Sequence, residues 1–130
     1  MPVRSLFATP FYDNRIGDTA LLAELEASCR MLAQEDRAGR AWSKAKGYRG
    51  YTSYASLDDL PLRDPAFADL KRLLDREARA FARAAHFDMG RAPRLDSLWV
   101  NVMKPGATHS GHIHPHSIIS GTFYVRVPPG

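Results

Sequence analysis

The stretch LWVNVMKPGATHSGHIHPHSIISGTFYVRVPPG, residues 98–130, decides the fold that the sequence predicts. Four of the chain's five histidines lie in it: His109, His112, His114 and His116. In an extended backbone successive side chains alternate between two faces, so His112 and His114 project to the same side and can bind a single ion. The stretch is therefore a candidate metal site.

Segments with the two-residue period of a β-strand lie on both sides of the histidines. In residues 95–103 one face is apolar (Leu98, Val100, Val102) and the other is mixed (Ser97, Trp99, Asn101, Met103). Residues 118–127 predict a second strand, with one apolar face (Ile119, Phe123, Val125, Val127) and one mixed face (Ser120, Thr122, Tyr124, Arg126). Lys104-Pro105-Gly106 is a turn signal between the first strand and the histidines.

The N-terminal part of the chain predicts helices with short extended segments. Residues 6–12 fit an edge strand because of their aromatic side chains and internal proline. Asp18 is expected to cap a helix that stops at Gly39. Residues 42–60 predict a long loop with a short strand near Tyr51 to Tyr54, whose tyrosines either line a pocket or are half covered by the domain.

A second amphipathic helix is expected to begin at Asp64-Pro65, an N-cap residue followed by proline at the first helical position. It should end near Gly90, with His86 in the last turn, where a protonated imidazole suits the helix dipole. We expect one domain over residues 1–130, with a helical and strand portion in 1–93 and the start of a β-barrel core in 94–130.

Composition limits the classes of function. The 130 residues are 45% hydrophobic and 25% charged, as in an ordinary globular protein. The net charge of +4 comes with scattered arginines and no basic run, so we expect no nucleic-acid partner. The single cysteine, Cys29, favours a cytoplasmic setting, and without a run of about 20 apolar residues we expect no membrane span.

The histidine spacing suits first-row transition metals, which commonly take neutral imidazole as a nitrogen ligand. Pro115 interrupts the run, so His116 need not share the face of His112 and His114. His109, three residues upstream of His112, is a candidate contact either to a metal-binding side chain or to the substrate. The sequence has no nucleophile elbow, phosphate loop or paired-cysteine zinc motif.

Taken together, these motifs resemble a family of bacterial Fe(II)- and 2-oxoglutarate-dependent oxygenases. The resemblance is carried by four elements: Trp99-Val100-Asn101, Pro105-Gly106, His112-Ile113-His114-Pro115 and Ser120-Gly121-Thr122-Phe123-Tyr124. The opening Leu6-Phe7-Ala8-Thr9-Pro10 and the helix that begins at Asp64-Pro65 also look like the N-terminal half of that family.

The resemblance implies an α+β protein built on a double-stranded β-helix, a jelly-roll or cupin-like barrel, with N-terminal helices packed on it. It implies an oxygenase that uses Fe(II) and 2-oxoglutarate to hydroxylate an unknown small-molecule or peptide substrate. His112 matches the first metal-binding histidine, and His114 stands where the commoner pattern has Asp or Glu. From their strand faces, Asn101 and Tyr124 are the candidate contacts for the co-substrate.

A barrel of this kind needs about eight core strands, and this sequence predicts three to five. We therefore expect an incomplete barrel, completed either by more of a longer protein or by another chain. An open half-barrel leaves unpaired strand edges and an apolar face, which favours a homo-oligomer.

Two other readings of the sequence stay open. Gly106, five residues and then His112 and His114 reproduce the start of a cupin signature, although Ile118 and Ile119 stand where its glutamate is expected. A non-enzymatic, truncated binding or assembly module, with histidines exposed to solvent, is the third reading.

Overall fold

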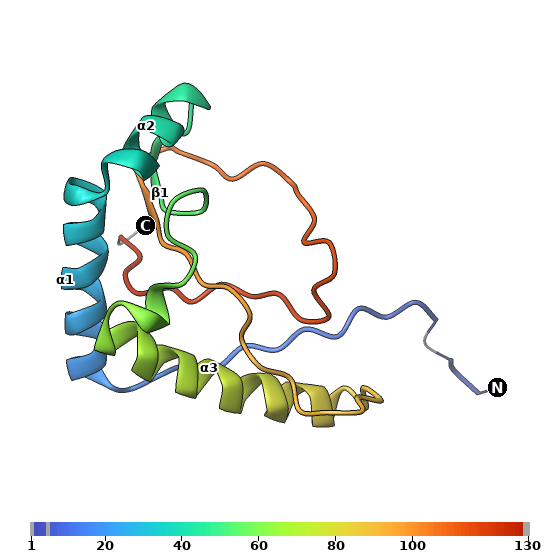
Figure 1. Ribbon diagram of the computed structural model, residues 1–130. Coiled ribbons are helices and arrows are strands. Elements are labelled where there is room, and N and C mark those ends of the chain that lie inside the picture. The colour runs from blue at the N-terminus through green and yellow to red at the C-terminus, as the bar shows by residue number, and fades with distance from the viewer. Residues whose placement is uncertain (1, 5, 129–130) are drawn as a thin grey trace.

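The computed structural model describes residues 2–4 and 6–128 and has the α+β composition that the sequence predicts (Figure 1). Three α-helices surround a small antiparallel sheet of two strands, and a long irregular segment follows the second strand. The elements in chain order are α1 (Thr19–Glu35), α2 (Arg37–Ala45), β1 (Gly50–Thr52), the short 3-10 helix η1 (Leu60–Leu62), α3 (Pro65–Ala84) and β2 (Asn101–Met103).

The predicted helix from Asp18 to Gly39 is two helices that meet at Asp36. Asp18 caps α1 by accepting a hydrogen bond from the backbone N–H of Leu21. Asp36 closes α1 and also caps α2, because its side chain accepts from the N–H of Gly39. Gly39 is therefore buried inside the first turn of α2, and its prediction as a helix stop was wrong.

The start of α3 is confirmed and its predicted end was wrong. The Asp64 side chain accepts from the N–H of Ala66, and Pro65 occupies the first helical position. The helix ends at Ala84, so His86 lies beyond the last turn, with a φ of 54°. Its backbone N–H donates to the carbonyl of Arg83, which satisfies one of the helix's terminal acceptors.

The sheet pairs β1 with β2, with Tyr51 opposite Val102. Side chains extend this short ladder beyond its ends. The N–H of Val100 donates to Oγ of Ser53, and the N–H of Thr52 donates to Oγ of Ser43 on α2. These hydroxyls are buried and satisfied, so they fix β1 between α2 and the segment that leads into β2.

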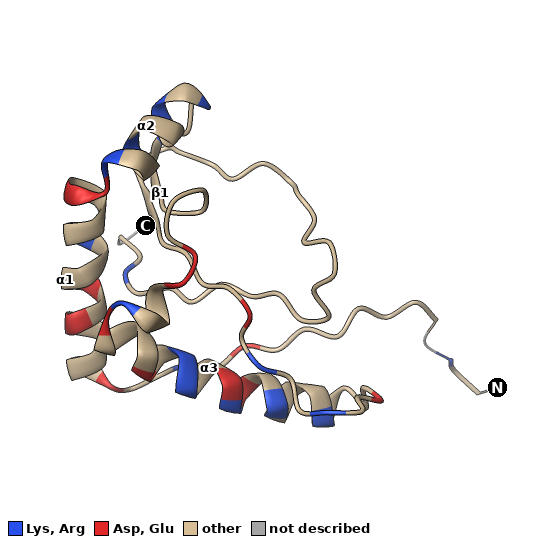
Figure 2. Ribbon diagram, in the orientation of Figure 1, with Lys and Arg blue, Asp and Glu red and all other residues tan. Residues whose placement is uncertain are grey.

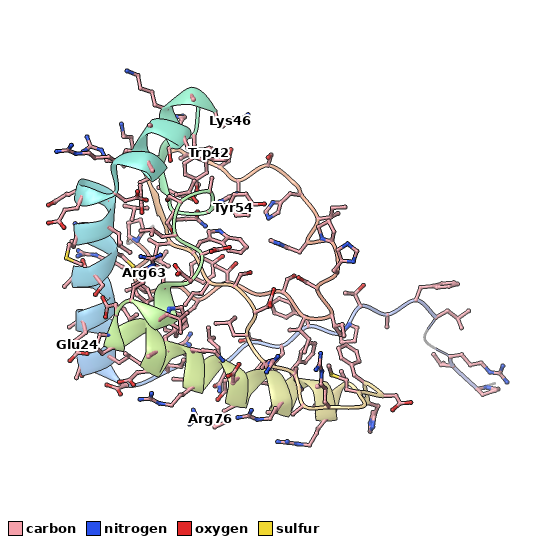
Figure 3. All side chains as sticks on the ribbon, viewed as in Figure 1. Glu24, Trp42, Lys46, Tyr54, Arg63 and Arg76 are labelled. Atoms are coloured by element: carbon pink, nitrogen blue, oxygen red, sulfur yellow. The ribbon has the colours of Figure 1, made fainter. Side chains whose placement is uncertain are left out.

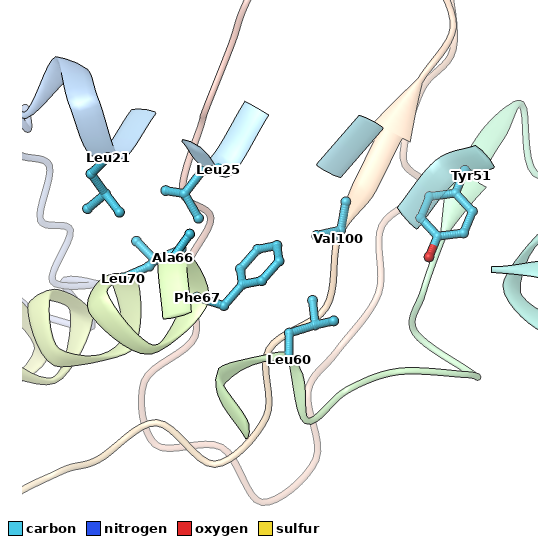
Figure 4. Close-up of a cluster of buried hydrophobic side chains, with 8 residues drawn as sticks. All are labelled: Leu21, Leu25, Tyr51, Leu60, Ala66, Phe67, Leu70 and Val100. Carbon is cyan, nitrogen blue, oxygen red and sulfur yellow. The ribbon is translucent and has the colours of Figure 1, made fainter. Parts of the chain in front are cut away.

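The core lies where α1, α3 and η1 meet the sheet (Figure 4). Leu25, Leu60 and Phe67 are almost completely removed from solvent, at 0%, 1% and 2% exposed. Val100 is also buried, and Leu98 and Val102 pack beside the core, which confirms the predicted apolar face of residues 95–103. The helices thus pack on the face of this strand segment that the sequence marked as apolar.

Three predicted strand segments are shorter than expected or absent. Residues 6–12 form an irregular arm, fastened to α3 where the hydroxyl of Tyr12 donates to Glu77. Of residues 95–103 only 101–103 form a strand, because β1 offers just three partners, and Leu98 makes an isolated bridge to Asp59. Residues 118–127 contain no strand; Phe123 and Val125 of the predicted apolar face pack against the core, whereas Val127 is 65% exposed.

The second strand is missing because a strand needs a partner backbone, and none is paired with 118–127 among the described residues. Alternation in the sequence indicates which side chains turn inward, but it supplies no such partner. In the part of the chain that the structure describes, the β-structure is one two-stranded sheet and one isolated bridge between Asp59 and Leu98. No helix within it is long and apolar enough to span a membrane.

Gly39 gives a direct test of the packing between α2 and β1. A Cβ at this position would lie 2.8 Å from Oγ of Ser56 and 2.9 Å from the carbonyl oxygen of Thr52, and closer still to the Asp36 carboxylate. We expect Gly39→Ala to lower the free energy of unfolding by about 1–3 kcal/mol through overpacking. Urea denaturation measures this. Gly17→Ala is the matched control, because nothing lies within 4 Å of the Cβ it would add.

Asp36 gives a pH test of the same contact between α2 and β1, which we call the α2–β1 corner and which includes Asp36, Gly39, Tyr51 and Ser56. Burial raises the pKa of Asp36, but hydrogen bonds from the N–H of Gly39 and the hydroxyls of Ser56 and Tyr51 outweigh burial and lower this pKa from its ordinary value. A lowered folded-state pKa stabilises the fold above the unfolded value, and this contribution is lost as the pH falls through the folded pKa.

We therefore expect Asp36→Asn to cost about 1–3 kcal/mol near neutral pH, because the hydrogen bonds to the charged carboxylate are lost. The difference from wild type should shrink on acidification, as measured by urea midpoints between about pH 6 and about pH 2. A difference that stays constant over this range would contradict the role given to the ionised carboxylate.

Candidate metal centre

The candidate site lies on the segment that follows β2. We call residues 104–117 the histidine loop; it leaves the end of β2 and swings away from the helices before the chain returns to the core (Figure 1). Its base is held to Arg49, the residue before β1, by two hydrogen bonds: the N–H of Lys104 donates to the carbonyl of Arg49 (3.1 Å), and the Arg49 guanidinium donates to the carbonyl of Gly106 (3.2 Å). Gly106 has a φ of 70°, which a glycine adopts without strain.

Within this loop the imidazoles of His112 and His114 face each other. Their Nε2 atoms are 3.1 Å apart and their ring centroids are 4.8 Å apart. Two nitrogen ligands about 2.1 Å from one ion and at right angles to each other are about 3 Å apart, so the observed spacing fits two ligands of one metal. The residues lie in an irregular loop and not in a strand, so the predicted local structure was wrong, although the two rings do come together.

The second nitrogen of His112 has a partner of its own. Nδ1 lies 2.9 Å from the carbonyl oxygen of Ser110, and a carbonyl can only accept. Nδ1 therefore carries the hydrogen, so Nε2 of the neutral ring is an acceptor, and it accepts a hydrogen bond from the Nε2–H of His114. Metal-binding histidines are commonly oriented by a hydrogen bond of this kind.

The other two histidines of the loop are placed differently. Nε2 of His109 lies 2.9 Å from the hydroxyl oxygen of Tyr48, and its ring centroid is 5.5 Å from that of His112. Burial raises the pKa of Tyr48, which keeps its hydroxyl protonated. His116 has a φ of 67°, in the left-handed region, and the N–H of the next residue, Ser117, closes a turn onto the carbonyl of His114.

Three aromatic residues from distant segments lie beside the histidine pair. We call Trp42, Tyr54 and Trp99 the aromatic wall; Trp42 and Tyr54 lie between the α2–β1 corner and the histidine loop (Figure 3). The Tyr54 centroid is 6.1 Å from Trp42 and 5.2 Å from Trp99, and the Trp99 centroid is 5.8 Å from His114. The wall and the imidazoles thus form one continuous series of ring contacts.

The two predicted co-substrate contacts lie apart from this series. Asn101 is exposed on β2, opposite Thr52 in the sheet register. Tyr124 is 72% exposed in residues 118–128, which follow the histidine loop and which we call the returning segment. Among the hydrogen bonds and ring contacts of residues 2–4 and 6–128, none joins either residue to His112 or His114.

The segments that carry the wall and the loop are basic, and the carboxylates of Asp58, Asp59 and Asp96 flank them in sequence. Residues 42–54 and 97–128, which carry the wall and the loop, contain no Asp or Glu, and their charged side chains are all basic (Figure 2). In the described residues no group of three His, Cys, Asp or Glu side chains is arranged to hold a metal. The histidine pair therefore supplies two neutral ligands and no compensating negative charge.

Cys29 offers no competing chemistry. Burial, reinforced by the nearby carboxylates of Asp64 and Glu26, raises the pKa of its thiol to about 11. The thiol is therefore neutral at physiological pH, and packing against the core accounts for it.

The fold and the site define an α+β protein with a two-histidine candidate metal centre on a loop beside an aromatic wall. Residues 97–130 match the model of a family described as "Putative 2OG-Fe(II) oxygenase". The match covers about a quarter of the chain and includes β2, the histidine loop and the returning segment. It confirms the family resemblance over these residues. No curated protein matches the chain significantly.

Sequence reasoning missed the residues that join the site to the rest of the fold. The role of Trp42 and Tyr48 beside the histidine loop was not predicted, because they are more than 55 residues from it in sequence. The only available signal was the density of aromatic residues in 42–54, which also suits a half-covered loop.

Metal binding is the first test of this centre. Co(II) added to the metal-free protein should quench the tryptophan fluorescence, because the Trp99 ring lies next to that of His114. We expect His112→Ala to weaken the titrated affinity at least about tenfold, as removal of one of two ligands should. His116→Ala is the matched control; equal titrations for the two variants would contradict the assignment of His112.

Proposed function

We propose that this chain carries the metal-binding segment of a non-haem, Fe(II)- and 2-oxoglutarate-dependent oxygenase that hydroxylates an organic substrate. His112 and His114 would hold the iron. The observation that carries the proposal is the 3.1 Å approach of their Nε2 atoms, within a segment that matches the oxygenase family model. The double-stranded β-helix barrel of such enzymes is part of the proposal, supported by the inward alternation of Phe123 and Val125.

The chain's own residues would act by orienting and isolating the metal ligands. The Ser110 carbonyl fixes the tautomer of His112, so its Nε2 is available as a ligand without a change of ring orientation. Trp99 lies against His114 and restricts the positions open to that ring. When bound, iron supplies the chemistry that couples oxidative decarboxylation of 2-oxoglutarate to hydroxylation of a C–H bond.

The charge of the ligand set has a consequence for the co-substrate. Two neutral imidazoles leave the charge of a divalent ion uncompensated, and the histidine loop that carries them contains no carboxylate. A dianionic co-substrate such as 2-oxoglutarate would therefore be attracted to the loaded centre. Asn101 and Tyr124 are our proposed contacts for it, on the basis of the strand faces that the sequence predicts for them.

A metal-binding module without oxygenase activity is the second candidate, in the way that some cupin-like proteins bind metals or effectors. It is favoured by the absence of a third ligating side chain beside the histidine pair in the described residues. The two candidates differ in one outcome, because only the oxygenase consumes 2-oxoglutarate.

The test is the conversion of 2-oxoglutarate to succinate by the protein with Fe(II), ascorbate and dioxygen, measured by mass spectrometry. We expect turnover by the wild type and a loss of at least about 100-fold in His112→Ala, because a missing ligand removes the metal and with it the chemistry. Metal binding without succinate formation would favour the second candidate.

His114→Asp serves as the matched variant in this assay. An aspartate restores the residue type of the commoner motif and adds one negative charge to the ligand set. We expect it to retain iron binding and turnover, whereas His114→Ala should lose both. Loss of turnover in His114→Ala with full iron affinity would show that His114 is not a ligand.

A further inference from the structure

A second candidate binding site lies at the C-terminal end of α3. Residues 87–93 turn beyond the helix, and the chain then runs back along it (Figure 1). A hollow of about 170 Å³ lies between the helix and this turn. All the residues that line the hollow belong to α3 or to the turn, so it is separate from the histidine loop.

Backbone and ring contacts hold the turn against the helix. The N–H of Phe87 donates to the carbonyl of Ala82 (2.9 Å) where the turn begins. The N–H of Leu95 donates to the Asp75 carboxylate (2.5 Å) just after the turn ends. The Phe87 ring also meets the ring of Phe81, at a centroid distance of 5.6 Å. Both ends of the turn are therefore tied to α3, and the hollow is part of the fold.

The lining of the hollow combines arginines with apolar side chains. Three of the lining residues are arginines: Arg79, Arg83 and Arg91. The others are apolar, and most of them are buried or half-buried: Ala82, Phe87, Met89 and Pro93. Guanidinium groups are permanently charged, planar donors that match the geometry of carboxylates and phosphates. Such a lining suits a ligand with an anionic group and a small apolar body.

The three arginines are not neutralised by ion pairs. In the part of the chain that the structure describes, the arginines in salt bridges are others: Arg30, Arg63, Arg72, Arg76 and Arg126. Figure 2 shows basic residues along the C-terminal half of α3 and in the segment that follows it. Positive charge therefore gathers around the hollow.

The nearby acidic groups leave this lining cationic. Five acidic residues lie in or next to the segments that form the hollow, and none lines it: Asp13, Asp75, Glu77, Asp88 and Asp96. Asp75 already accepts from Nζ of Lys71 and from the N–H of Leu95, and Glu77 accepts from the hydroxyl of Tyr12. Asp88 is exposed and lines a neighbouring hollow, which Arg91 also lines.

The C-terminal end of a helix repels anions through its free carbonyl groups. Three of the last carbonyls of α3 already accept the backbone N–H groups of residues 85–87. Their repulsion is therefore reduced, and the arginines decide which charge the hollow attracts.

We propose that this hollow binds a small organic phosphate, with its phosphate among the three arginines and its apolar body against Phe87 and Met89. Three arginines favour phosphate over a single carboxylate, because a phosphate carries nearly two negative charges and three terminal acceptor oxygens. The body has to be short, since the hollow is smaller than the about 300–1,000 Å³ of a pocket for a drug-sized ligand. The inference does not depend on metal binding by the histidine pair.

The test follows the backbone amide signals of residues 86–92 in a proton–nitrogen NMR spectrum of the full chain. Low ionic strength keeps the charge interactions unscreened. The four probes are isobutyl phosphate, inorganic phosphate, isovalerate and isobutyltrimethylammonium. The second probe lacks the apolar body, the third carries a carboxylate in place of the phosphate, and the fourth reverses the charge.

We expect saturable shifts of these signals with isobutyl phosphate. Inorganic phosphate and isovalerate should bind at least about threefold more weakly, because each lacks one of the two groups that the lining matches, and the cation should not bind. Binding of isovalerate as tight as that of isobutyl phosphate would overturn the assignment to phosphate. Shifts that never saturate, or equal binding of the cation, would overturn the site.

Variants separate contact in the hollow from attraction by net charge. Arg83 and Arg91 are both exposed, so their replacement leaves the core intact. We expect Arg83→Gln and Arg91→Gln each to weaken the binding of isobutyl phosphate at least about fivefold, because each removes charge-assisted hydrogen bonds. Arg94→Gln is the matched control: Arg94 is exposed next to the turn and does not line the hollow. Equal losses in Arg83→Gln and Arg94→Gln would overturn the inference.

Discussion

The carboxylate of Asp36 is the contact on which the arrangement of the site depends. It accepts hydrogen bonds from the N–H of Gly39 and from the hydroxyls of Tyr51 and Ser56, so one side chain joins the end of α1, the start of α2, β1 and the loop beyond it. Burial of Tyr51, together with this carboxylate, raises the pKa of the tyrosine, which therefore stays a donor. The corner fixes where α2 and β1 lie.

From that corner a chain of short-range contacts leads to the histidines. Ser43 and Ser53 are buried hydroxyls that bond to the backbone of Thr52 and Val100, so α2, β1 and the segment before β2 are tied together. The position of Trp42 is set by α2, on which it lies, and the position of Trp99 is set by its neighbour Val100. The geometry of the aromatic wall is thus set by a polar network behind it.

The histidine pair itself has a more local origin. His112 and His114 are separated by one residue, and Ser110, which orients His112, is two residues upstream. The long-range contacts of the loop are the ring of Trp99 against His114 and the hydroxyl of Tyr48 against His109. Ligand spacing is therefore a property of a short segment, whereas the surroundings of the ligands come from residues more than 10 positions away in sequence.

Sequence reasoning was most accurate where a local signal sufficed. The caps Asp18 and Asp64 and the apolar face of Leu98, Val100 and Val102 needed only neighbouring residues. It failed at Gly39, because glycine is a frequent helix stop but here fills a space next to Asp36 that no side chain fits. It also failed at residues 118–127, where alternation gave the inward face but not a partner strand.

The sequence by itself determined the helix starts, the inward-facing residues, the family resemblance of residues 97–130 and the two histidines at ligand spacing, because each is encoded within a few consecutive positions. Only the tertiary structure decided that α1 and α2 meet at Asp36, that β2 pairs with β1 and that Trp42, Tyr54 and Tyr48 lie beside the histidine loop. These contacts join residues far apart in the chain, and the packing and hydrogen bonds that select them exist only once the segments are assembled.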